Sequence, residues 1–132
     1  MVYKLDIVHK KYYYNKRIEL VRYELIETDN TACYDYDRGT SWKKEGNDKT
    51  STFRMAAYFK NIESRKIFLA LDDESQKILV QRLAEEWQMY GDYYTMKLIL
   101  RRESNRVFYD LSKSGIVGSG HAYGYLDLKF KD

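Results

Sequence analysis

The feature that most restricts the fold is one amphipathic segment, DDESQKILVQRLAEEWQMYG, at residues 72–91. Leu79, Leu83 and Trp87 recur along it at helical spacing and form an apolar stripe. Acidic residues gather at its start, where they favour the helix dipole, and a glycine ends it. The segment therefore predicts one principal helix, about residues 73–90, whose stripe must be covered by another element.

The start of this helix has its own signals. Asp72 or Asp73 can cap the N-terminus, and Gln76 follows Asp73 at the spacing of a capping box. The run SRKIFLAL, residues 64–71, comes just before it. Periodicity does not decide so short an apolar run, so both a strand and a helical lead-in stay open for it.

Most of the other segments read as strands, because they alternate apolar and polar residues or are rich in β-branched and aromatic residues. They are VYKLDIV (2–8), RIELVRYELIE (17–27), TACYDYD (31–37), TFRMAAYFK (52–60), YYTMKLILRRE (93–103) and HAYGYLDLKFK (121–131). Alternation of this kind indicates a sheet covered on one side. We therefore predict a single α+β domain over residues 1–132, with a mostly antiparallel, curved sheet of five to seven strands covered by the principal helix.

Composition restricts the function classes. The net charge is +3, and no apolar run has the roughly 20 residues that span a bilayer. A lone Cys33 cannot form an internal disulfide, and residues at zinc-binding spacing do not accompany it. Asp35 and Asp37 resemble the start of a calcium loop, but Gly39 and Gly46 stand where ligands are required. These observations predict a cytoplasmic protein with no membrane segment, metal or cofactor.

The N-terminal stretch HKKYYYNKR, residues 9–17, interleaves aromatic rings with positive charge, a combination used by proteins that bind single-stranded nucleic acid. In a strand, the first and third of the three consecutive tyrosines share a face. Structural tyrosines in a hairpin are the alternative interpretation. The candidate contact residues are Lys10, Lys11, Tyr12, Tyr14, Lys16 and Arg17.

The segment SKSGIVGSGHAYGY, residues 112–125, holds four of the seven glycines. It precedes a strand and lacks a Gly-Lys-Ser/Thr sequence, so it is not a phosphate loop of the Walker type. We predict a solvent-exposed loop over residues 113–120, with a plain strand connection as the alternative. In the loop interpretation Ile116 and Val117 dock into a partner or a second subunit, and His121 and Tyr123 form the rim.

A metal-independent ribonuclease needs a base, an acid and cations that hold phosphate. His121, Glu103, Arg101 and Arg102 are of the required types, although their spacing is not diagnostic. A histidine exposed at a strand end is the simpler interpretation.

The function that we predict from these features is a small non-catalytic cytoplasmic binding protein. The Pro-free, Tyr- and Lys-rich composition is similar to that of small accessory proteins of AT-rich phages and mobile elements, some of which inhibit host defence complexes. This similarity implies an inhibitor of a host protein or nucleoprotein complex, acting in the host cytoplasm, and a homo-oligomer is compatible with it. Direct binding of single-stranded nucleic acid or a nucleotide is the first alternative, and the ribonuclease is the second. Genomic composition is an equal explanation for the 14 tyrosines.

Overall fold

We describe a computed structural model that covers residues 2–29, 37–38, 43–46, 48–86, 93–115 and 118–132. Strands β1 (Val2–Tyr12), β2 (Ile18–Thr28), β3 (Asp37–Arg38), β4 (Lys43–Glu45) and β5 (Asp48–Phe59) come first in the chain. Helices α1 (Ile62–Ala70) and α2 (Asp73–Glu86) follow, and β6 (Tyr93–Glu103), β7 (Arg106–Gly115) and β8 (Gly118–Leu126) complete the fold.

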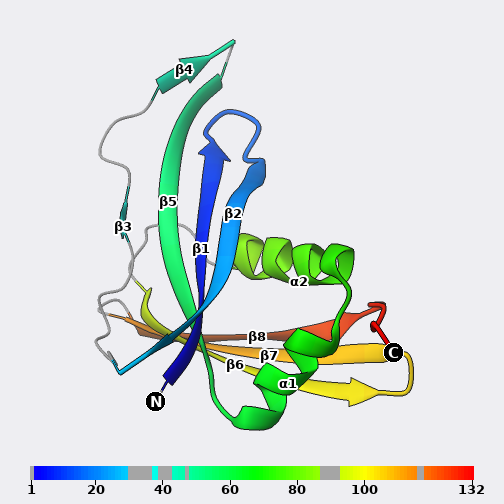
Figure 1. Ribbon diagram of the computed structural model, residues 1–132. Helices are drawn as coiled ribbons and strands as arrows, with labels where there is room; N and C mark the ends of the chain where they lie inside the picture. The colour runs from blue at the N-terminus through cyan, green and yellow to red at the C-terminus, as the bar shows by residue number, and fades with distance from the viewer. Residues whose placement is uncertain (1, 30–36, 39–42, 47, 87–92, 116–117) are drawn as a thin grey trace.

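One curved sheet organises the molecule, in the order β2-β1-β5-β6-β7-β8, with β3 and β4 paired to β5 outside this path. All the pairings are antiparallel except β5–β6, which is parallel and joins only two residue pairs. In Figure 1, β1, β2 and β5 stand upright, β6–β8 run across the base, and α2 lies in the angle between the two halves. The predicted α+β architecture, with its mostly antiparallel sheet, is confirmed.

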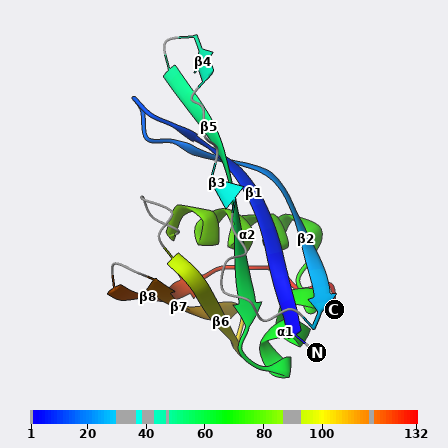
Figure 2. The same cartoon turned by 90° about the vertical axis from the view of Figure 1, so that its left-hand side faces the viewer.

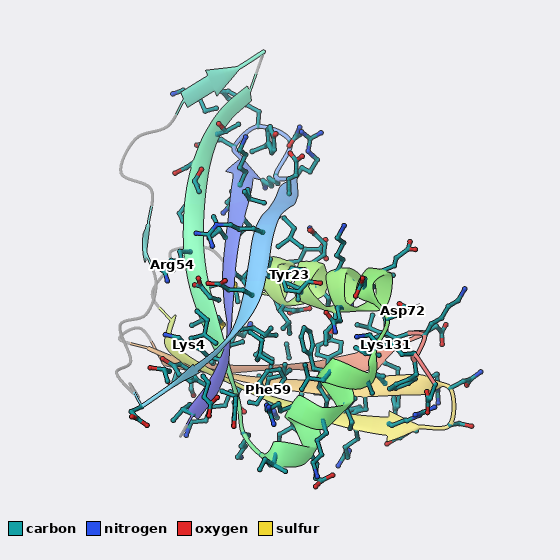
Figure 3. The ribbon with its side chains drawn as sticks, in the orientation of Figure 1. Lys4, Tyr23, Arg54, Phe59, Asp72 and Lys131 are labelled. Carbon is teal, nitrogen blue, oxygen red and sulfur yellow. The ribbon has the colours of Figure 1, made fainter. Side chains whose placement is uncertain are left out.

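The core lies between the sheet and the helices, as the alternation predicts. Side chains from β1, β5, β6 and β7 meet the buried stripe of α2 there. Phe53, Met55, Ala57, Phe59, Met96, Leu98 and Leu100 are all buried, as are Leu79 and Leu83 of the helix. Figure 3 shows Tyr23 on the α2 side of the sheet and Arg54 on the opposite side.

The run that sequence left open is helical and forms most of α1. Asn61 caps this helix, because its Oδ1 accepts a hydrogen bond of 2.8 Å from the backbone N–H of Ser64. The buried Ser64 hydroxyl in turn accepts a hydrogen bond of 2.8 Å from the backbone N–H of Leu100 in β6. A local cap and a contact with a strand far along the chain therefore both stabilise α1, and the periodicity of the apolar run reveals neither.

The start of α2 differs in one detail from the expectation. Asp72 is the cap, since its Oδ1 accepts a hydrogen bond of 2.8 Å from the N–H of Ser75, and this bond lowers the pKa of Asp72. Gln76 does not complete a capping box. Its amide instead donates to the carbonyl oxygens of Phe68 and Leu71, at 3.1 and 3.3 Å, and so ties α2 to the end of α1. The described helix ends at Glu86, and Trp87 lies outside the described residues.

The prediction of a loop over residues 113–120 is wrong for most of its length. Strand β7 continues to Gly115 and β8 begins at Gly118, with Ser114 paired to Ser119 and Lys113 to Gly120. Cross-strand pairing overrides the glycine signal here, because glycine permits an extended strand as readily as a loop. Strands β7 and β8 therefore pair on both sides of residues 116–117, which lie outside the described residues, and the alternative interpretation of a strand connection fits this pairing.

One other strand prediction needs correction, and a second falls mostly outside the described residues. The last strand ends at Leu126, and beyond it a single bridge joins Phe130 to Leu71. Of the predicted strand over residues 31–37, only Asp37 lies within the described residues, where it belongs to β3.

Candidate binding surfaces

The first candidate surface, which we call the basic arm, consists of residues 10–19 and 43–50. These are the ends of β1, β2, β4 and β5 together with the connecting turns. Two backbone hydrogen bonds close it: Tyr12 N–H to Arg17 O at 2.9 Å and Tyr13 N–H to Lys49 O at 2.8 Å. Figures 1 and 2 show that the arm rises beyond α2, away from β6–β8.

The basic arm concentrates the charge of the molecule. It holds seven of the 23 Lys and Arg residues but only three of the 20 Asp and Glu residues. The rest of the chain therefore has 16 basic and 17 acidic residues. Sequence reasoning found the four cations of the β1–β2 turn: Lys10, Lys11, Lys16 and Arg17. It missed Lys43, Lys44 and Lys49, which only the pairing of β4 and β5 brings into the same arm.

The tyrosines of the arm do not lie on one strand in the way that the sequence predicted. Strand β1 ends at Tyr12, and the chain turns at Tyr13, so Tyr12 and Tyr14 do not share a strand face. The Tyr12 side chain is only 7% exposed. Its hydroxyl donates to a Glu19 carboxylate oxygen at 2.7 Å, and the Arg17 guanidinium lies 4.0 Å from the ring centroid. Tyr12 therefore holds the arm together rather than presenting a free ring.

The exposed rings of the arm are Tyr13 and Tyr14, at 57% and 59% exposure. They pack edge to face, with 5.2 Å between the ring centroids. The turn is fixed by Asn15, whose Oδ1 accepts a hydrogen bond of 2.9 Å from the N–H of Arg17, and by Lys16, which adopts a φ of 56°. Two large rings thus lie beside the cations at the tip of the arm.

The second candidate surface, the open face, is the side of β6–β8 that points away from the helices. His121, Tyr123 and Tyr125 alternate along β8, and Tyr125 lies opposite Phe108 of β7. Arg101 stacks on the Phe108 ring, 4.5 Å from its centroid, and a similar cation–π contact joins Arg106 to Tyr125 at 4.4 Å. The open face is therefore aromatic and basic, but it is remote from the basic arm.

The structure does not assemble the proposed ribonuclease set. His121 lies opposite Ser112, which faces Lys97, while Glu103 is six residues farther along β6. At ~3.3 Å per residue, roughly 20 Å separates the histidine from Glu103. His121 instead forms a hydrogen bond between its Nε2 and the Asp110 carboxylate.

The remaining members of that set also lie apart. Arg101 stacks on the open face, whereas Arg102 stacks on Phe130, at 3.7 Å from the ring centroid. Ile116 and Val117, the proposed docking pair, lie outside the described residues. Tyr123, which belongs to their proposed rim, is 69% exposed, more than any other large apolar side chain among the described residues.

A third feature is an open groove of about 1040 Å³ between the edge strand β2 and α2. Leu20, Val21 and Tyr23 line one side, and Ile78, Gln81 and Arg82 the other. Four basic and three acidic residues line it, so the groove has no dominant charge.

Neither a metal centre nor a membrane helix is found in the part of the chain that the structure describes. No group of three or more His, Cys, Asp or Glu side chains gathers there in a way that could hold a metal ion. No described helix is long and apolar enough to cross a bilayer. Asp35, which with Asp37 resembles the start of a calcium loop, lies outside the described residues.

Comparison of the chain with protein-family models, curated proteins and solved structures finds no match.

Proposed function

We propose that the chain is a small non-catalytic binding protein that contacts nucleic acid, free or within a nucleoprotein complex, through its basic arm. The observation that supports this most directly is the charge distribution, since seven of the basic residues and only three acids lie in the arm. Cations that follow a phosphate backbone provide most sequence-independent affinity for nucleic acid. The exposed Tyr13 and Tyr14 rings add surfaces on which bases can stack.

Salt dependence tests this proposal. Binding of a fluorescent single-stranded oligonucleotide should weaken steeply between about 50 and 200 mM salt. The triple variant Lys10→Gln, Lys11→Gln, Lys16→Gln should reduce the slope of log affinity against log salt by about 2, because each lost phosphate contact removes about 0.7. The matched control replaces Lys66, Lys77 and Lys131, which are exposed elsewhere, and should leave the slope unchanged. Equal effects of the two triple variants would contradict a role for the arm.

A protein-directed inhibitor is the second candidate function. The groove between β2 and α2 supports it, because Val21 and Ile78 are exposed there beside Gln81. Pull-down from lysate with and without nuclease separates the two candidates. A nucleic-acid-mediated association disappears on nuclease treatment and at high salt, whereas direct association with a purified protein survives both.

A further inference from the structure

The two edges of the sheet differ in how they are protected. An exposed edge strand offers unpaired backbone groups to other chains, and soluble proteins guard such edges with bulges, charges or covering groups. Strand β2 has all three. Its register shifts opposite Val8 and His9, and it carries Glu19, Arg22, Glu24 and Glu27.

The covering group on β2 is the Gln81 side chain of α2. Its Nε2 donates to the Ile18 carbonyl at 2.8 Å, and its Oε1 accepts from the Leu20 N–H at 3.2 Å. One amide group thus occupies the edge in the way that a neighbouring strand would. A further strand is therefore blocked at this position.

Among the described residues, none of these guards is found on strand β8. Its sequence, GSGHAYGYL, contains no Lys, Arg, Asp, Glu or Pro, and its pairing with β7 runs without a register shift from Gly118 to Leu126. Among the described strands, none lies beyond β8 in the sheet. Figure 2 shows β8 at the outer end of the β6–β8 group. This edge is open, uncharged and regular.

We propose that β8 pairs antiparallel with β8 of a second copy of this chain, with the two-fold axis at Ala122. This is the one register that pairs all nine residues of the strand, since Ala122 is its midpoint. It places Ala122 opposite Ala122, Gly120 opposite Gly124 and His121 opposite Tyr123. The pattern is self-complementary, as a two-fold interface requires.

The charge of β8 and its exposed aromatic rings both favour a second copy of the chain as the partner of this edge. Like charges opposite each other destabilise antiparallel pairs, and β8 has no Lys, Arg, Asp or Glu that would meet its own equivalent. On the open face, each exposed Tyr123 ring would gain the second copy's His121 as a direct neighbour. The same His–Tyr contact already occurs within one chain, at 6.0 Å between the ring centroids of His121 and Tyr123.

Site-directed cross-linking in a Cys33→Ser background, without nucleic acid, tests the register. Directly opposed residues in an antiparallel pair have Cα atoms about 4.5–5.5 Å apart, within the range that a disulfide spans. Ala122→Cys should therefore give a disulfide-linked dimer under mild oxidation. Ser119→Cys, which this register places opposite Tyr125, should give none above background. Equal cross-linking at both positions would overturn the proposal.

Sedimentation across a concentration series tests the association itself. The natural chain should show a monomer–dimer equilibrium, and Tyr123→Lys should raise the dissociation constant at least tenfold by placing the usual guard residue on this edge. Tyr14→Lys makes the same change on the basic arm and should have no effect. A chain that stays monomeric over the series, or an equal response to the two lysines, would refute the pairing of β8.

Discussion

His9 is a titratable side chain enclosed in the sheet. It is 1% exposed, and its ring stacks on Phe53 with 5.7 Å between the ring centroids. Burial, with a smaller contribution from the positive charge of Lys11, lowers the pKa of His9 to about 4. The folded protein therefore contains a neutral imidazole over most of the pH range in which histidine normally gains a proton.

A dependence of stability on pH follows from this buried histidine. Since the folded pKa lies below the unfolded value of about 6.5, only the unfolded chain takes up the proton between pH 6.5 and pH 4. The free energy of unfolding should then decrease by roughly 1.4 kcal/mol per pH unit as the pH falls through this window, and the effect should be absent above it. Urea denaturation at several pH values measures it. His9→Phe keeps a ring at this position and should remove the slope, whereas the exposed His121→Gln should retain it.

Gly124 provides a second residue-scale prediction. A Cβ atom at this position would lie 3.3 Å from the ring and the hydroxyl oxygen of Tyr109, which is buried and accepts a hydrogen bond from Arg82 at 3.4 Å. Gly124→Ala should therefore cost about 1–3 kcal/mol of unfolding free energy, because the ring must move. In a Tyr109→Leu background, thermal or urea unfolding should show little further loss. A full loss in that background would contradict the ring contact as the cause.

At the scale of elements, α2 supplies the clearest prediction. Leu83 is fully buried against the sheet, so Leu83→Ala should lower the free energy of unfolding by about 2–5 kcal/mol. Glu86 lies one turn later and is only partly buried. The backbone carbonyl of Glu86 accepts a hydrogen bond of 2.9 Å from Lys113 Nζ, and an alanine keeps this carbonyl. Glu86→Ala should therefore be nearly neutral in the same denaturation experiment. Comparable losses for the two variants would show that α2 does not bury the predicted stripe.

The elements that could be predicted are those whose periodicity is long. The stripe of α2 and the alternation in β5 and β6 span enough residues to identify both the element and its buried face. The conformation of α1 depends partly on a partner distant in sequence, since Ser64 is bonded to Leu100. The strand ends around residues 113–120 pair with near neighbours, but their glycines are compatible with a loop as well as with a strand. Local pattern alone does not contain that information.

The candidate sites were predictable only in part, for the same reason. Positive charge and tyrosines near Lys10 are visible in the sequence, but the placement of Lys49 beside Tyr13 requires the sheet pairing. Burial of Tyr12 beneath Arg17 also depends on where β1 ends. The contrast between the guarded β2 edge and the open β8 edge needs the complete strand order.

At the scale of the whole molecule, the basic arm separates charge along the long direction of Figure 1. The arm has an excess of four positive charges and the remainder an excess of one negative charge. An anionic partner would orient such a charge distribution during diffusion, with the arm toward the partner. Orientation of this kind acts mainly on the association rate. The arm would therefore shorten the search for a partner even where other surfaces determine how long the complex lasts.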